Sequence, residues 1–572
     1  MYLKKSKQKN GRVHLDIIES YYDPIKKSTR QKTIKSLGYV DELSVIHDDP
    51  IEYYTNILNN YKHTFENDPY SILFRFQEDE KMNNSNLHEK NFGFIIFSKI
   101  YHGLELHKFF TNKQRHLNAS YSANDLFKIF LNGHLISRYD RKSWFQKRQT
   151  YHTEDLVDYF NFIRNNTYDL FKWIHKHIKN YYDRGNCYIY ENIAKFTFTS
   201  SNSAELKVNR SKANMYEQMQ NSIYLTMYLD SHGVPYAYRQ IDKYNCHEDS
   251  KLFRKKLQKD MDIKKFVIVG DRTNITEDEL NQELLENENM RYVFSVNPAY
   301  ASQETQKYIL DQSLERIYAK NNMFKSRLCP RMISQSDGTN KVILERQLML
   351  RNESKKINDA QLRENLLTKA RNIIQFAENY SVMDIGEEIR YIKKLLFLPN
   401  GKIDIQNSIL ELDNTLISHE RKFDGVKLII TNEPIKSVGH IIDVYYYQYS
   451  LESVLKNTRC RMQRKSPKFK QDAYNDYTTT VNTVTFTGLV MLRLLYLSLD
   501  KKYTMTKLLE TVSKYNCILV QKNYYLFTYY DDVLDDLGRR LELDLNKRIR
   551  TLKEIKHIIA KVKQTDFELT LK

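Results

Sequence analysis

The stretch KKFVIVGDR, residues 264–272, decides the fold of the chain. Its apolar run from Phe266 to Val269 is typical of a strand buried on both faces, and Asp271 follows directly. The segment before it, Glu248 to Asp260, has the pattern of a helix. Three apolar stretches precede that helix and predict successive strands: CYIYENIAKFTF (187–198), NSIYLTMYLD (221–230) and VPYAYRQI (234–241). The order strand, strand, strand, helix, strand predicts an α/β unit.

This order resembles a ribonuclease-H-like sheet, in which acids lie on the first strand and just after the fourth. We therefore expect a core in two parts, residues 186–296 and 424–500, with residues 297–423 as a subdomain inserted between the second and third acids. The second part contains a predicted strand, FDGVKLIITN (423–432), and a predicted long helix over 437–462.

The regions on either side of the core are predicted from their patterns. Residues 1–50 predict a β-hairpin whose turn and second strand carry several basic residues, and residues 51–185 predict a helical region that could bind DNA. Residues 501–572 predict a basic helical C-terminal region. A solvated surface is the alternative interpretation of the basic hairpin.

Composition favours a polyanionic partner. The 572 residues carry 89 Lys and Arg against 71 Asp and Glu, a net charge of +18. An AT-rich coding bias is the alternative source of the lysines and of the 43 tyrosines. The 5 cysteines form no C-x-x-C pair, which favours a reducing cytoplasm over a zinc ribbon or a disulfide framework. The most apolar run, Val484 to Leu499, includes Arg493 and is interpreted as a buried helix, so no membrane partner is expected.

The predicted long helix carries a stripe of functional side chains. Tyr445, Gln448, Glu452 and Arg459 lie at offsets 0, 3, 7 and 14, which at about 100° per residue places them on one face. This spacing resembles the Tyr, Arg, Glu, Lys signature of bacterial insertion-sequence transposases of the insertion-sequence-four superfamily. The chain has Gln448 where that family has Arg and Arg459 where it has Lys.

Other segments carry the same resemblance. VIVGDR is similar to the valine-rich strand of the family with its Asp-Arg, here Asp271 and Arg272. GRVHLDIIESY (11–21), IKSLGYVDEL (34–43) and LERQLMLRN (344–352) resemble parts of one branch of these transposases. The family also has a Ser-Lys motif, matched here by Ser211 and Lys212, although the acid and the Arg that usually follow it are missing.

The resemblance implies a DDE-type enzyme that cuts double-stranded DNA at the terminal inverted repeats of its element and joins the freed 3′-hydroxyl to target DNA. It implies three metal-binding carboxylates, Glu191, Asp271 and Glu452, which hold two Mg²⁺ ions, with Mn²⁺ as a substitute. It implies DNA contacts by Tyr445, Gln448, Arg459, Lys212 and Arg272, and a homodimer on DNA.

Glu191 stands where the family has Asp, and its extra methylene displaces the carboxylate in a site that demands near-octahedral geometry. Two alternatives therefore stay open. One is a transposase-derived protein that binds DNA without cutting it, and the other is a nuclease unrelated to mobile elements.

Overall fold

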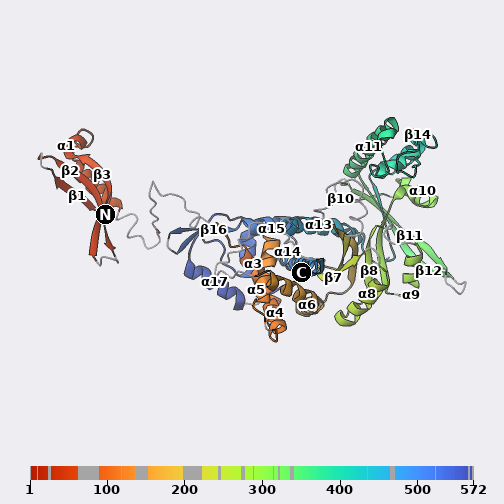
Figure 1. Cartoon of the computed structure of the whole chain (residues 1–572), viewed down its shortest axis with the longest axis horizontal. Coiled ribbons are helices and arrows are strands. Elements are labelled where there is room, and N and C mark those ends of the chain that lie inside the picture. The colour runs from red at the N-terminus through yellow and green to blue at the C-terminus, as the bar shows by residue number, and fades with distance from the viewer. Residues whose placement is uncertain are drawn as a thin grey trace. The chain divides into compact units, whose positions relative to one another are not determined.

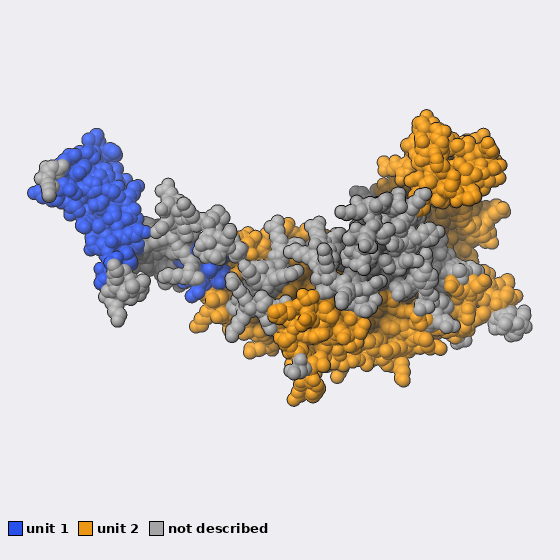
Figure 2. Space-filling model, in the orientation of Figure 1, with its two compact units in different colours: residues 1–88, 519–525 blue, residues 89–518, 526–572 orange. Residues whose placement is uncertain are grey.

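The chain divides into two compact units, residues 1–88 with 519–525 and residues 89–518 with 526–572 (Figure 2). The computed structural model describes residues 2–8, 11–23, 28–61, 72, 89–117, 119–136, 152–197, 222–242, 247–271, 277–287, 289–313, 315–319, 322–334, 340–433, 436–463, 471–521, 523–564 and 567–569.

The first unit contains an antiparallel sheet in the order β1-β2-β3, followed by two helices. The elements are β1 (Tyr2–Lys7), β2 (Val13–Asp23), β3 (Ser28–Tyr39), α1 (Val40–Leu43) and α2 (Pro50–Tyr61). The hairpin of β2 and β3 forms as the alternating pattern predicted, and β1 adds a strand that the sequence analysis did not predict. Leu15 and Ile18 are buried, whereas the first nine residues of β3 are exposed and include Arg30, Lys32 and Lys35.

In the second unit, nine strands of the described residues form one sheet in the order β10-β11-β12-β15-β9-β8-β5-β6-β7. Figure 1 labels β7, β8, β10, β11 and β12 of this sheet. The strands are β5 (Cys187–Thr197), β6 (Ser222–Leu229), β7 (Pro235–Asp242), β8 (Phe266–Asp271), β9 (Met290–Val296), β10 (Arg316–Ala319), β11 (Asn322–Ser334), β12 (Asn340–Asn352) and β15 (Val426–Thr431). β8 pairs in parallel with β5 and with β9, and the remaining pairs are antiparallel. The mixed α/β class and the strands predicted around residue 271 are confirmed.

Helices connect and cover this sheet. Those that follow the sheet strands are α8 (His247–Met261), α9 (Glu277–Glu286), α10 (Gln303–Leu310), α13 (Val438–Gln463) and α14 (Gln471–Ser498). A helical region precedes the sheet, as the periodicity predicted: α3 (Phe94–Gly103), α4 (Leu106–Gln114), α5 (Ala123–Leu135) and α6 (Thr153–Lys179). The window Asp476–Ser498 of α14 is long and apolar enough to span a membrane, with a mean hydropathy of 1.3, but 89% of it is buried in the protein. This burial favours a core helix.

Residues 297–423 do not form a single separate unit. β10, β11 and β12 extend the central sheet, because β12 pairs with β15 from Arg346↔Thr431 to Arg351↔Val426. The part of the segment from α11 onward packs around its own apolar core, which includes Leu367, Ile373 and Tyr391. Its elements are α11 (Glu353–Gln375), η5 (Glu387–Tyr391), β13 (Ile392–Lys394), β14 (Ile409–Leu412) and α12 (Asn414–Arg421).

The C-terminal region contains strands as well as the predicted helices. It comprises α15 (Met505–Lys514), β16 (Asn516–Gln521), β17 (Tyr524–Phe527), α16 (Asp532–Leu541), β18 (Ile549–Thr551) and α17 (Leu552–Gln564). The short strand β4 (Lys90–Asn91) pairs with β16, and the buried Asn91 amide donates to the carbonyl oxygen of Val512 at 2.9 Å. The start and the end of the second unit are therefore joined.

Candidate functional site

The parallel pair β5 and β8 brings two predicted acids to one edge of the sheet. The register runs from Cys187↔Phe266 to Tyr190↔Val269; Glu191 is the next residue within β5, just past the end of this pairing, and Asp271 ends β8. The carboxyl ends of parallel strands meet at the same edge, where open α/β sheets bind their ligands. Asp271 is exposed there, and Glu191 is half-buried.

Two tyrosines of β5 form hydrogen bonds to helix α13, which packs against this sheet. The Tyr188 hydroxyl lies 2.9 Å from Nε2 of His440, and the buried Tyr190 hydroxyl donates to the carbonyl oxygen of Val444 at 2.8 Å. Both bonds join side chains of one face of β5 to the first half of α13. The helix that carries the predicted stripe therefore has a fixed position over β5.

Tyr445 of α13 lies beside Asp271. Burial raises the pKa of the Tyr445 hydroxyl, and the negative charge of Asp271 raises it further, while hydrogen bonding to Ser295 and Tyr449 opposes both effects. Ser295 is the register partner of Asp271 on β9, which places all three groups on one face of the sheet. The tyrosine of the stripe and the acid at the end of β8 are thus brought together.

The other stripe positions are described in part. Gln448 is half-buried. Glu452 and Arg459 belong to α13, but their side chains lie outside the described residues. Position 452 follows Tyr445 by seven residues, which on a helix is the same face about 10 Å further along the axis. The predicted DNA contacts Lys212 and Arg272 also lie outside the described residues.

Glu191 has a surrounding that the sequence did not predict. The pairing of β5 with β6 shifts register between Tyr190 and Ala194, so β5 contains a bulge immediately after Tyr190. Burial chiefly raises the pKa of Tyr228 on β6, and the charge of Glu191 adds to this effect. The charge of Glu191 thus contributes to the raised pKa of Tyr228, and the charge of Asp271 contributes to the raised pKa of Tyr445.

The described residues contain no cluster of three His, Cys, Asp or Glu side chains that could hold a metal ion. The third predicted acid, Glu452, is outside that test because its side chain is not described. The two acids that the structure does place provide carboxylate oxygens, which are the ligands that Mg²⁺ prefers. The donor chemistry at this edge therefore fits a hard divalent cation.

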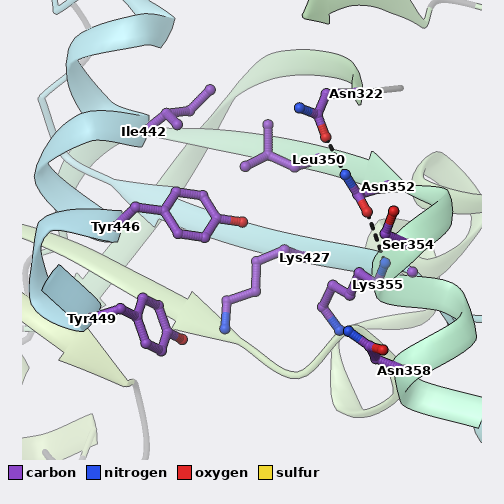
Figure 3. A pocket seen from close by; sticks show the side chains of 11 residues that line it. Asn322, Leu350, Asn352, Ser354, Lys355, Asn358, Lys427, Ile442, Tyr446 and Tyr449 are labelled. Atoms are coloured by element: carbon purple, nitrogen blue, oxygen red, sulfur yellow. Dashed lines mark hydrogen bonds between the residues drawn. The ribbon is translucent and has the colours of Figure 1, made fainter. Parts of the chain in front are cut away.

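A cavity of about 520 Å³ lies beside Tyr445, between α13, the end of β12 and the start of α11 (Figure 3). Two of its lining tyrosines, Tyr446 and Tyr449, are 42% and 48% exposed and lie three residues apart on α13. The amino group of Lys427 lies 4.9 Å from the centre of the Tyr445 ring, and no described acid forms an ion pair with it. Figure 3 shows Lys427 between these tyrosines and the polar side chains of Lys355 and Asn358. Exposed aromatic rings beside a lysine are groups that bind nucleic acid.

Sequence reasoning did not select Lys427, Tyr446 or Tyr449. The run YYYQY at residues 445–449 was a signal, since adjacent tyrosines on a helix cannot all face one core. No local pattern connects Lys427 to that run, because β15 and α13 meet only in the folded chain.

One comparison with known proteins finds a family match, over the N-terminal part of the chain. Residues 3–67 match the N-terminal domain of the IS1634 family of transposases. This match supports an insertion-sequence transposase. No curated protein matches the chain. Among solved structures, the chain is similar to the piggyBac transposase in a cryo-EM synaptic complex with hairpin DNA, with 9% identity and 82% of each chain covered. The TM-score of 0.27 is too low for an inference about the fold.

Proposed function

We propose that this chain is a DDE-type transposase that cleaves DNA at the terminal inverted repeats of an insertion sequence and transfers the freed 3′ end to target DNA. The observation that carries the proposal is the parallel pair of β5 and β8, which brings the strand of Glu191 beside the strand that ends at Asp271, with Asp271 next to Tyr445 on the helix that carries position 452. The N-terminal match to a transposase domain supports the same function independently.

The strand order supports a ribonuclease-H-like core. β5, β6 and β7 form an antiparallel meander, α8 follows, and β8 returns to pair in parallel with β5 on the side away from β6. β9 continues in parallel beyond β8. In such a sheet, ends of the first and fourth strands lie side by side, which is where a catalytic site needs two acids.

Each residue has a role in this proposal. Glu191, Asp271 and Glu452 would hold two Mg²⁺ ions, with Mn²⁺ as a substitute. The ions, when bound, would activate the attacking oxygen and stabilise the leaving one. Tyr445, buried against Asp271, would keep that carboxylate oriented. The other proposed DNA contacts are Gln448, Arg459, Lys212 and Arg272.

The first unit offers a separate surface for the DNA backbone. Arg30, Lys32 and Lys35 are exposed on β3, a strand whose first nine residues face solvent on both sides. Basic side chains on an open sheet bind phosphates without reading sequence. Because two element ends must be joined in one reaction, we propose that the protein acts on DNA as a homodimer, in the cytoplasm.

The surroundings of Glu191 favour a second candidate function, a DNA-binding protein that no longer cuts. Glu stands at the position of the first acid, and the pairing of β5 with β6 shifts register between Tyr190 and Ala194, the segment that contains Glu191. A carboxylate displaced from the metal position would leave DNA binding intact while cleavage is lost.

The test is cleavage of an end-labelled DNA fragment that carries the repeats flanking the coding sequence, in Mg²⁺ and in Mn²⁺. The unaltered protein, Glu191→Asp and Glu452→Ala are compared, and binding of the same fragment is measured in parallel. The proposal predicts metal-dependent cutting by the unaltered protein and none by Glu452→Ala, with binding retained. Binding without cutting, and cutting restored by Glu191→Asp, would instead establish the second candidate. Cutting that persists in Glu452→Ala would contradict the assigned site.

A further inference from the structure

A second cavity, of about 460 Å³, lies on the other side of α13 from Tyr445. Its lining includes Tyr447, which follows Tyr445 by two residues and so, at about 100° per residue, lies on the opposite face of the helix. The turn of residues 230–233 also lines it, and that turn follows β6 at Leu229, the register partner of Tyr188 near the start of β5. Tyr188 and Tyr190 of β5 line the cavity as well, so it extends from that turn along β5 to the residue before Glu191.

A buried arginine points into this cavity. Arg493 of α14 is 9% exposed, and its Nε donates to the carbonyl oxygen of His232 at 2.6 Å. Its guanidinium carbon lies 4.5 Å and 4.7 Å from the ring centres of Tyr447 and Tyr496. Within the described part of the chain, its two terminal nitrogens have no hydrogen-bond partner and it forms no ion pair. A guanidinium that is held between two aromatic rings and keeps N–H donors available can bind an anion.

The turn backbone approaches this guanidinium closely. Gly233 has a φ of +74°, and a Cβ at this position would lie 2.9 Å from Nη2 of Arg493. Only glycine leaves the room that the arginine occupies. The backbone of the turn therefore fixes the position of the Arg493 guanidinium.

Further positive groups line the same cavity. Lys501 is exposed, and α15 begins there with the cap Thr504, whose side chain accepts from the Lys507 amide at 3.2 Å. The amino end of a ten-residue helix attracts anions through its free amide groups. Burial lowers the pKa of His232, and the negative charge of Asp230 opposes that shift. The positive charges of Lys501 and Arg493 lower the same pKa further, because both cations lie close to the His232 ring.

The acids near the cavity do not neutralise Arg493. Asp230 is fully buried and accepts bonds from Arg184, Tyr182 and the amides of His232 and Val234. Asp443 is exposed on α13, and within the described residues it forms no ion pair with Arg493.

We propose that this cavity is a phosphate-binding site, in which the terminal nitrogens of Arg493, the Lys501 ammonium and the amino end of α15 hold one phosphoryl group. Tyrosine side chains form much of the remaining wall, and the volume is in the range of small-molecule sites, larger than a bare phosphate requires. The ligand is thus a phosphate ester with an attached sugar or base, either part of a DNA strand or a free nucleotide. The site does not depend on the proposed cleavage chemistry.

The test begins with inorganic phosphate, titrated calorimetrically into the full chain at constant ionic strength against NaCl. The main variant is Lys501→Asn, since Lys501 has a φ of +61° and Asn tolerates that conformation. Lys514→Gln, an exposed lysine at the far end of α15, is the matched charge control. We expect Lys501→Asn to weaken phosphate binding about tenfold and Lys514→Gln to leave it unchanged. Arg493→Gln, checked for folding by circular dichroism, should abolish binding.

A second measurement identifies the source of the phosphate. If the ligand is DNA, Lys501→Asn lowers the slope of log affinity against log salt by about 0.9, and Lys514→Gln does not. If the ligand is a free nucleotide, adenosine monophosphate binds more tightly than inorganic phosphate and the DNA slope is unchanged. Either result supports the site. Absence of phosphate binding by the unaltered chain, or equal losses in Lys501→Asn and Lys514→Gln, would overturn it.

Discussion

Replacing Arg184 by methionine should destabilise the edge of the central sheet by about 3 to 5 kcal/mol, because the change leaves the Asp230 carboxylate buried without its charge partner. The side chains of Arg184 and Asp230 are 1% and 0% exposed, and Nε donates to Oδ2 at 2.8 Å. Arg184 also donates to the carbonyl oxygens of Val234 and Pro235, each at 2.7 Å, so the substitution leaves those acceptors without this donor.

Hydrogen exchange is the appropriate assay, since a chain of several units does not unfold in one step. Protection of peptides covering residues 222–242 reports the local free energy of opening. Asp230→Asn should also lower the local free energy of opening. The double variant Arg184→Met with Asp230→Asn should lower it by less than the sum of the two single effects, because it removes both charges.

Lys264→Met is the matched control. Lys264 pairs with Asp183, the residue before Arg184, at 3.3 Å, but the two side chains are 66% and 71% exposed. Its loss should change the free energy by no more than about 0.5 kcal/mol. If Arg184→Met costs as little as Lys264→Met, or if the two buried substitutions are additive, the reasoning about the buried pair is wrong.

Three further outcomes follow from individual groups. Burial raises the pKa of Glu554, but hydrogen bonds from Lys547 and Thr551 outweigh it and bring the pKa to about 2. Exchange protection of α17 should therefore be full above pH 4.5 and fall toward pH 2, and Glu554→Gln should remove that dependence. Burial, aided by the charge of Lys128, lowers the pKa of His102 to about 3. The contribution of the neutral imidazole to the stability of the helical region is therefore full above pH 6.5 and is lost as the pH falls toward 3. His102→Gln should make the free energy of unfolding less dependent on pH in that range. Gly233→Ala places a Cβ 2.8 Å from the Tyr447 ring at a φ of +74°. The substitution should lower the free energy of unfolding by about 1 to 3 kcal/mol, and calorimetry should show this as a lower melting temperature.

The sequence predicted the central strands because their patterns are local. β8 is buried on both faces, so its apolar run from Phe266 to Val269 is continuous, and Asp271 marks its end. The turn at Gly233 separates β6 from β7 in the same visible way. These signals were sufficient for the strand order up to Asp271.

Other parts of the fold depend on contacts between distant segments. β4 has only two residues and no periodicity, and it is held by the polar Asn91, which bonds to residues more than 400 positions away. The pairing of β12 with β15 joins residues about 75 to 85 apart and is equally invisible to a local pattern. For this reason, part of the segment predicted as a subdomain instead extends the central sheet.

The candidate site was predictable to a similar degree. Helical spacing placed Tyr445 on one stripe with Glu452, and strand order placed Asp271 at the sheet edge. The surroundings of Glu191 could not be predicted, because the bulge after Tyr190 is seen only in the pairing with β6. Lys427 lines the cavity beside Tyr445 from β15, and no local pattern in the sequence connects it to α13.

The central claim is that carboxylates at the edge of β5 and β8 hold the metal ions for DNA cleavage. Its most direct test is a Mn²⁺ titration of the full chain on its terminal-repeat DNA, followed by electron paramagnetic resonance, with Asp271→Asn and with Asp262→Asn as an exposed control on the loop before β8. We predict that the unaltered chain and Asp262→Asn bind two Mn²⁺ ions and that Asp271→Asn loses at least one of them. Equal Mn²⁺ binding by Asp271→Asn and the unaltered chain would contradict the account.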